Sequence, residues 1–167
     1  MNDLLNDHDR EGLVAERDAI LNAARTVIIA AGTGEVPEIG VTPMVRHQGQ
    51  VFIYPSRLSA HVRCMLEAEK AQFMFVQDEA DAQNIWARKR IKICANIIEI
   101  ERNSNEFNEV ASIFTEAHGP TMKLIRDFSD FHMLKLLPEN GVMVLGFAKA
   151  YRLEGASLDI VSHLRES

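Results

Sequence analysis

The sequence predicts a mainly β protein of the α+β kind, built as a six-stranded antiparallel barrel with helices at its periphery. Three observations lead to this expectation. Stretches in which apolar and polar residues alternate recur along the chain, and Gly- or Pro-containing turns separate them. Helical patterns interrupt these stretches too irregularly for βαβ units. An antiparallel sheet closed into a barrel satisfies all three observations better than a doubly wound sheet.

Each predicted strand rests on alternation and on the turn that bounds it. Gly32, Thr33 and Gly34 complete neither the GxGxxG nor the GxxxxGK[ST] pattern, so a hairpin turn is favoured over a phosphate-binding loop. The run Pro138 to Gly141 predicts a second hairpin turn. The predicted strands are 26–31, 38–45, 50–54, 71–76, 88–101, 130–137 and 142–151, of which six or so would form the barrel.

Helices are predicted where apolar residues recur at a period near 3.6. Ser56 is a plausible cap for the second of them, and Gly119 with Pro120 ends the third. Residues 78–86 form an acidic loop or helical turn. The predicted helices are 9–25 within an N-terminal helical segment 1–25, then 58–68, 103–117 and 121–126, and finally 156–165 within a C-terminal helical tail 152–167.

Composition and charge exclude several classes of protein. The chain has 167 residues with 47% hydrophobic and 25% charged residues, which predicts one ordered domain over residues 1–167. A formal charge of −6 argues against nucleic-acid binding, which normally needs a basic excess. The start of the chain has no secretory signal pattern, and no apolar run is long enough to cross a membrane. Cys64 and Cys94 form no CxxC pair, so reduced thiols and a cytoplasmic location are expected.

Two segments are candidate anion sites. The run from Ser56 and Arg57 to His61 follows a strand and opens a helix, where unpaired N–H groups favour phosphate or carboxylate. Plain capping beside a solvated arginine explains the same residues. Arg88, Lys89 and Arg90 form the one dense basic cluster. Strand alternation would place Arg88 and Arg90 on one face, where they could clamp an anion, although a solvated sheet edge is the alternative.

The six histidines show no HExxH or other zinc spacing, so a metal held by protein ligands alone has little support. On alternation, His132 shares a strand face with Asp130, and an ordinary surface pair is the alternative. His163 lies near the end of the chain, where a histidine usually has no special role. No Ser/His/Asp or Cys/His order is evident in the sequence.

Four collinear blocks within residues 20–163 resemble the haem-utilisation proteins of the HugZ/HutZ type. The segment Val76 to Ile91, with its Ala87-Arg88-Lys89-Arg90 run, is similar to a "DE…FARKRL" block. Ser59-Ala60-His61 resembles an "A-x-H" helix start. The other two blocks are Asp130 to Gly141, which resembles "DFxLxxLxPxxG", and Gly146 to Tyr151, which resembles "GFGxAY" with Ala148 in place of the second glycine.

The resemblance implies the split-barrel fold of the pyridoxamine 5′-phosphate oxidase-like, FMN-binding superfamily, as a homodimer with two cofactor sites at the subunit interface. It also implies haem binding, with oxidative haem cleavage in several members. By position, Asp130 matches an aspartate that orients the iron-ligating histidine, and Arg90 matches a basic residue of the haem site. That histidine lies on a C-terminal segment a few residues beyond the "HL" that His163 and Leu164 resemble, so His163 is the candidate iron ligand in this sequence. His132 stands where the family more often has an apolar residue, and it could supply a ligand of its own.

Three alternatives remain open at this level. FMN could replace haem, with its phosphate at Ser56 and Arg57 and at Arg88 or Lys89. The protein could carry or store haem without cleaving it. It could also be a barrel that has kept its dimer and lost its cofactor.

Overall fold

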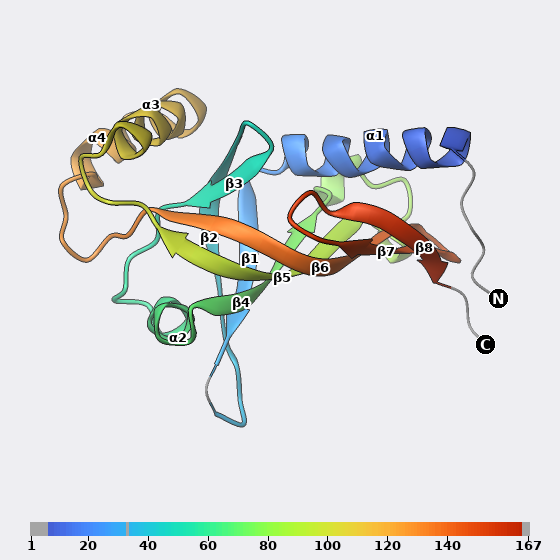
Figure 1. The fold of residues 1–167 in the computed structure, drawn as a ribbon, viewed down its shortest axis with the longest axis horizontal. Coiled ribbons are helices and arrows are strands. Elements are labelled where there is room, and N and C mark those ends of the chain that lie inside the picture. Colours follow the sequence, from blue (N-terminus) through green and yellow to red (C-terminus); the bar gives the residue numbers. More distant parts are fainter. Residues whose placement is uncertain (1–6, 33, 165–167) are drawn as a thin grey trace. The chain divides into compact units, whose positions relative to one another are not determined.

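The structure is a computed structural model that describes residues 7–32 and 34–164. Eight strands form one sheet in the order β3-β2-β1-β4-β5-β6-β7-β8 (Figure 1). The strands are β1 (Thr26–Ala31), β2 (Glu38–His47), β3 (Gln50–Ile53), β4 (Lys70–Val76), β5 (Arg90–Glu99), β6 (Leu134–Gly146), β7 (Lys149–Glu154) and β8 (Asp159–Leu164). The α-helices are α1 (Asp7–Ala23), α2 (Ala60–Ala68), α3 (Asn105–His118) and α4 (Thr121–Ile125), with single 3₁₀ turns η1 (Glu79–Asp81) and η2 (Ile85–Ala87).

An additional pairing between β3 and β6 closes the first six strands into an antiparallel barrel, and β7 and β8 extend the sheet. This confirms the predicted fold class. The chain divides into two compact units: unit 1 comprises residues 1–24, 72–95 and 138–167, and unit 2 comprises 25–71 and 96–137. Three strands, β4, β5 and β6, have residues in both units. A single domain over the whole chain therefore stays a prediction.

In unit 2, local turn chemistry produces the first hairpin. Thr26 to Ala31 pair with Pro43 to Glu38 in register, which confirms a turn at Gly32 and Gly34 and excludes a phosphate loop there; Thr33 lies outside the described residues. The buried face of α3 packs into an aromatic cluster with β3, as its apolar spacing predicts. This cluster contains Phe52, Tyr54, Phe107, Phe114 and Met133 among its buried members.

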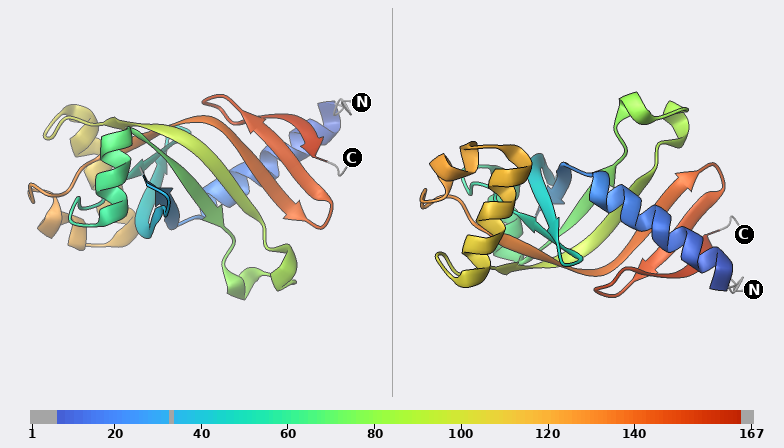
Figure 2. Two further views of the ribbon diagram at one scale, coloured as in Figure 1. Left: turned by 90° about the horizontal axis from the view of Figure 1, so that it is seen from below. Right: turned by 90° about the horizontal axis from the view of Figure 1, so that it is seen from above.

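In unit 1, α1 lies beside β8 (Figure 2). Ile20 and Leu21 of this helix are buried, as the periodicity predicts. Polar contacts fix its position, because Arg17 donates to the carbonyls of Ser157 and Leu158 at 3.1 and 3.0 Å.

The predicted helical tail over 152–167 is wrong, because β7 and β8 occupy its described part. Gly155 and Leu158 have φ values of 76° and 53°, so the chain reverses between them and pairs with itself. Ile160 is buried between the exposed Asp159 and the half-buried Val161, which is the two-residue period of a strand. In this short segment, Leu158, Val161 and Leu164 also recur every three residues, so a helical face fits the sequence as well as a strand face does.

The predicted hairpin at Pro138 to Gly141 is also wrong, because β6 runs without interruption from Leu134 to Gly146. Gly141 is needed for a close approach and not for a turn. A Cβ there would lie 2.5 Å from the Lys92 carbonyl oxygen. The chain turns five residues later, where Gly146 and Ala148 have φ values of 157° and 55°.

Candidate functional site

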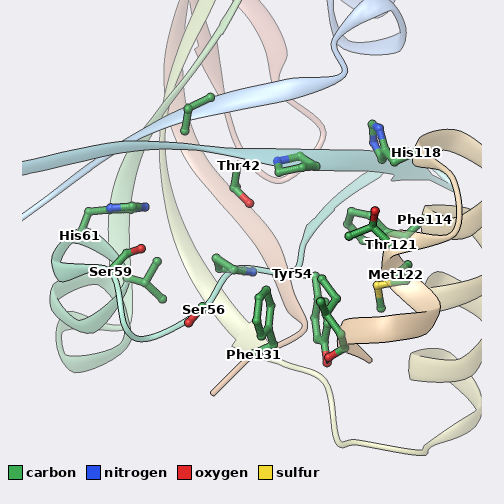
Figure 3. A pocket seen from close by; sticks show the side chains of 15 residues that line it. Thr42, Tyr54, Ser56, Ser59, His61, Phe114, His118, Thr121, Met122 and Phe131 are labelled. Carbon is green, nitrogen blue, oxygen red and sulfur yellow. The ribbon is translucent and has the colours of Figure 1, made fainter. Parts of the chain in front are cut away.

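Unit 2 contains a cavity of about 200 Å³ that brings together side chains from β2, α2, α3, α4 and the segments flanking them (Figure 3). Its walls are largely apolar and aromatic. Tyr54 and Phe131 stand side by side on one wall, with ring centroids 5.4 Å apart. Besides Tyr54, six residues with polar side chains line it: Thr42, Ser56, Ser59, His61, His118 and Thr121.

At the edge of this cavity, Ser56 holds the carboxylate of Asp130. The Ser56 hydroxyl donates to Asp130 Oδ2 at 2.5 Å, and Ser56 forms an isolated β-bridge with Phe131. The Arg57 N–H donates to the Asp130 carbonyl at 2.8 Å, so backbone and side chain both fix the two segments together. The structure therefore places Asp130 next to a residue that lines the cavity.

The same contacts correct the predicted helix start. The helix α2 begins at Ala60 with Ser59 as its N-cap residue, so Ser56 does not cap it. The N–H groups of Arg57, Leu58 and Ser59 donate to Asp130 O, Ser56 Oγ and Ser56 O. These donors are therefore occupied, and a carboxylate stands beside them. The geometry does not support a phosphate site at Ser56 and Arg57.

His61 lies at the α2 end of the cavity (Figure 3). Its imidazole occupies the space next to Gly40 of β2, where an added Cβ would lie 2.0 Å from Cε1 and 2.4 Å from each ring nitrogen. Burial lowers the pKa of His61 below its usual value, and the nearby Glu38 carboxylate opposes this effect. The side chain is therefore mainly neutral at pH 7.

Arg102 holds the cavity wall and was not among the residues singled out from the sequence. Its guanidinium donates to the Tyr54 hydroxyl at 3.1 Å, to the carbonyls of Phe128 and Phe131 at 3.0 and 2.7 Å, and to the Arg126 carbonyl. It also lies 5.6 Å from the centroid of the Phe107 ring. One side chain thus fixes the segment on which Asp130 and Phe131 lie.

Tyr54 shares a carbonyl acceptor with Arg102. Its hydroxyl donates to the Arg126 carbonyl at 2.7 Å. Burial raises the pKa of Tyr54, while the hydrogen bond and charge of Arg102 act in the opposite direction. The phenol is therefore a neutral donor, and its ring is free to form the cavity wall.

In the sequence, the only signal for Arg102 is a basic residue after a long strand, which is too common to be informative.

The predicted pairing of Asp130 with His132 on one strand face is wrong. Both residues precede β6, which begins at Leu134, so strand alternation does not apply to them. Asp130 contacts Ser56, whereas His132 Nδ1 lies 2.6 Å from Glu99 Oε1. His132 Nε2 is buried and has no hydrogen-bond partner among the described residues.

In unit 1, residues of the basic cluster bond to nearby groups of the same unit. Arg88 precedes β5 and donates to the Gln77 carbonyl at 3.0 and 2.6 Å and to Glu79 at 3.2 Å. Lys89 pairs with Glu16 at 2.7 Å. Arg88 and Arg90 therefore do not form the predicted clamp on one strand face, because only Arg90 belongs to β5. The segment that carries η1 and η2 extends away from β4 and β5 (Figure 2).

His163 lies in β8 of unit 1, and not on a helix. Its Nε2 lies 2.8 Å from the Ala148 carbonyl oxygen, and its ring centroid is 4.9 Å from that of Tyr151. Because a carbonyl only accepts, Nε2 carries the proton, and any lone pair for a metal would be on Nδ1. Within residues 7–32 and 34–164, no group of three or more His, Cys, Asp or Glu residues could hold a metal ion, and no helix is long and apolar enough to cross a membrane.

A closed six-stranded barrel with added strands and helices is the split-barrel fold of the pyridoxamine 5′-phosphate oxidase-like proteins. In agreement, a solved Clostridium acetobutylicum protein described as belonging to the pyridoxinephosphate oxidase family superposes with a TM-score of 0.65 at 15% identity, over 86% of this chain and 95% of that one. The chain is 30% identical to Heme oxygenase HutZ of Vibrio cholerae over 130 residues, which cover 78% of this chain and 74% of HutZ. The protein therefore belongs to the haem-utilisation family of the HugZ/HutZ type.

Solved structures agree with this assignment. ChuZ from Campylobacter jejuni superposes with a TM-score of 0.80 at 28% identity over 92% of this chain. The chain spans only 63% of the ChuZ chain. HutZ, described as the heme storage protein from Vibrio cholerae, superposes with a TM-score of 0.70 at 23% identity, over 86% of this chain and 96% of that one. No protein-family profile matches the sequence.

Proposed function

We propose that this protein binds haem, and that the unit 2 cavity with its Ser56 and Asp130 pair forms part of the binding site. The observation that carries the proposal is the carboxylate of Asp130, held by Ser56 at the edge of an apolar, aromatic cavity. HutZ, which is described both as a heme oxygenase and as a heme storage protein, supports the same class of ligand.

The residues present fit part of a haem. Aromatic and aliphatic walls suit the macrocycle, and His61 contributes a neutral imidazole of the kind that ligates iron. The cavity of about 200 Å³ is smaller than the ~300–1,000 Å³ that usually encloses a drug-sized ligand. Much of a haem would therefore lie outside this cavity and would need a second surface to cover it.

In this proposal, Asp130 would accept a hydrogen bond from the free ring nitrogen of the histidine that holds the haem iron. Such a carboxylate fixes the imidazole tautomer and raises its basicity. The Ser56 hydroxyl restricts rotation of the carboxylate, which is the structural requirement for that role. Arg90 in unit 1 remains a proposed contact for an anionic group of haem, stated independently of the unit 2 cavity. Its guanidinium donates to the Arg88 carbonyl at 3.0 Å, whereas Arg88 and Lys89 pair with the carboxylates of Glu79 and Glu16.

We propose a second copy of this chain as the covering surface. In the β1–β2 hairpin, Val36, Ile39 and Val41 are 82%, 70% and 62% exposed, and Ile39 and Val41 share one face of β2. Large exposed apolar side chains on one strand face are typical of an interface. Sedimentation of the Ile39→Lys variant tests this: a monomer is expected, whereas Leu124→Lys on α4 should remain dimeric.

Bound haem would supply a redox-active iron, which allows oxidative cleavage as well as storage. We propose cleavage, with storage as the alternative, since the names given to HutZ include both. Ascorbate added to the haem complex in air should remove the Soret band and release iron. A Soret band that persists under these conditions would assign the protein to haem storage or transport.

The flavin alternative has less support. The N–H groups that could hold a phosphate at Ser56 and Arg57 are occupied, and the Asp130 carboxylate would repel it. A flavin spectrum of the protein as isolated, together with no response to hemin, would nevertheless establish FMN. The thiols of Cys64 and Cys94 are free, which is compatible with the cytoplasmic location that we propose.

The decisive experiment is an absorption titration of the purified full chain with hemin. A saturable Soret band at one haem per subunit is expected. Asp130→Asn should weaken binding and shift the spectrum of the complex. Asp127→Asn is the matched control, because that carboxylate is largely exposed and lies 3.8 Å from Arg126. A wild-type titration without saturation would refute haem binding, and equal behaviour of both variants would remove Asp130 from the site.

A further inference from the structure

We propose that Arg102 is a positioning residue of the haem site, which holds the Asp130 segment (residues 126–132) in the conformation that presents the Asp130 carboxylate. The inference rests on the proposed function and deepens it, because it names a residue that acts on Asp130 through the main chain. Arg102 and the whole Asp130 segment belong to unit 2.

The Asp130 segment lies outside the helices and strands. It follows α4, which ends at Ile125, and precedes β6, which begins at Leu134. Two turns link Phe128 to Ile125 and Phe131 to Phe128 through N–H to carbonyl bonds of 3.0 and 3.2 Å. Because the segment does not belong to a helix or a sheet, its remaining carbonyl groups need donors from other parts of the chain.

Arg102 supplies several of these donors from one guanidinium group. Its Nη1 bonds to the Arg126 carbonyl, and its Nη2 bonds to the carbonyls of Phe128 and Phe131 at 3.0 and 2.7 Å. The acceptors thus lie before and after Asp130 in the chain. A planar group with several donors therefore fixes the main chain on both sides of the carboxylate.

The position of Arg102 is itself restricted by the turn between β5 and α3. In this turn, the Ser104 N–H donates to the Glu101 carbonyl at 3.1 Å. The guanidinium also donates to the Tyr54 hydroxyl at 3.1 Å and lies 5.6 Å from the centroid of the Phe107 ring. Because these contacts already hold the side chain, it loses little conformational freedom when it bonds to the Asp130 segment.

Ser56 and Arg102 act on Asp130 in different ways. Ser56 bonds to the carboxylate itself, whereas Arg102 bonds to main-chain carbonyls on either side of it. Loss of the Arg102 bonds would let the main chain of the segment move. A functional group must stay within ~0.5 Å of its productive position, so such a movement would weaken the proposed bond from Asp130 to the histidine that holds the haem iron.

Amide hydrogen exchange of the haem-free chain tests the structural part of this inference. Arg102→Gln removes the charged donors, and Arg102→Lys keeps the charge without the planar set of donors. Both should increase exchange over residues 126–132 by about tenfold, as expected when charge-assisted hydrogen bonds are lost. Circular dichroism shows whether each variant is folded, and the lysine variant serves if the glutamine variant is not.

Arg126→Gln is the matched control for this experiment. Arg126 lies 5.9 Å from the centroid of the same Phe107 ring, but its guanidinium donates to the Asn108 side chain at 2.9 Å. We expect exchange over residues 126–132 to stay within about twofold of the wild type, because an exposed side-chain bond contributes little.

Resonance Raman spectra of the ferrous haem complex test the functional part. The stretching frequency of the iron–imidazole bond reports the hydrogen bond to that imidazole, because a carboxylate partner raises its basicity. Asp130→Asn and Arg102→Lys should both lower this frequency, and Arg126→Gln should keep the wild-type value. The double variant of Asp130 and Arg102 should shift the frequency no further than Asp130→Asn alone, since Arg102 acts through Asp130.

Three results would overturn the inference while leaving haem binding intact. They are wild-type exchange over residues 126–132 in the Arg102 variants, a wild-type Raman frequency in those variants, and a double variant whose shift equals the sum of the single shifts. A wild type that binds hemin without an iron–imidazole band would overturn the roles of both Asp130 and Arg102. A wild type that binds no hemin would overturn the proposed function and this inference with it.

Discussion

The Ser56 hydroxyl and the Asp130 carboxylate lie 2.5 Å apart although 74 positions separate them in the chain. The bond connects the segment after β3 to the segment before β6, and β3 and β6 are the strands whose pairing closes the barrel. The position of Asp130 therefore depends on barrel closure as well as on its local sequence.

Ser56→Ala removes the hydroxyl that restrains Asp130. We expect the free energy of unfolding to fall by ~1–3 kcal/mol, as for a hydrogen bond to a charged group. Hemin affinity should fall as well, because the carboxylate can rotate. Urea denaturation measures the first effect and Soret titration the second. Ser129→Ala is the control, since Ser129 is exposed and does not line the cavity; an equal loss in both variants would contradict this role of Ser56.

Arg102→Gln should destabilise the protein by ~2–4 kcal/mol, because it removes charged donors from several carbonyl groups at once. Arg126→Gln is the matched control. Arg126 lies 5.9 Å from the same Phe107 ring, but its guanidinium bonds to Asn108 on the surface. We expect less than ~1 kcal/mol for this control. Similar values for the two variants in denaturant unfolding would show that the ring contact dominates.

Gly141→Ala tests whether β6 is continuous. The added Cβ would meet Lys92 O at 2.5 Å and Ile93 Cγ2 at 2.9 Å, so we expect a loss of ~1–3 kcal/mol from overpacking. Gly12→Ala on α1, where the new Cβ meets nothing within 4 Å, should instead stabilise the helix by ~0.5–1 kcal/mol. A neutral Gly141→Ala substitution in thermal unfolding would argue against this strand register.

The lowered pKa of His61 predicts a dependence of stability on pH. The folded state binds this proton less tightly than the unfolded state, whose pKa is about 6.5. The contribution of His61 is therefore fully present above that value and is lost as the pH falls through the lower pKa of the folded state. In urea unfolding between pH 5 and 8, His61→Gln should show a smaller loss of stability on the acid side. Parallel curves for the variant and the wild type would contradict this prediction.

The sequence predicted those features that depend on neighbouring residues. The turn at Gly32 and Gly34, the apolar face of α3 and the alternation of β5 are local patterns, and they formed as expected. The run Asn140-Gly141 carried an equally strong local signal for a turn, but pairing with β7 and the approach of Lys92 made it part of a strand. Tertiary contacts decided this case against turn chemistry.

The same contrast between local patterns and tertiary contacts applies to the residues of the candidate site. Ser56, His61 and Asp130 were singled out from the sequence, and two of them line the cavity, while the third is bonded to one of those two. Arg102 and Tyr54 were missed because their roles come from carbonyls of residues 126–131, which no spacing rule connects to them. The pairing of Asp130 with His132 failed because β6 begins later than alternation indicated.

The close packing of the His61 ring against Gly40 has a consequence for how these two positions can change during evolution. A residue with a Cβ at position 40 is compatible only with a smaller or displaced side chain at position 61, since the ring now fills that space. The reverse does not hold, because a glycine at 40 leaves room for a side chain smaller than imidazole at 61. Relatives should therefore lose the histidine before they lose the glycine, and a homologue with alanine at 40 and histidine at 61 would need a β2 backbone that lies farther from α2.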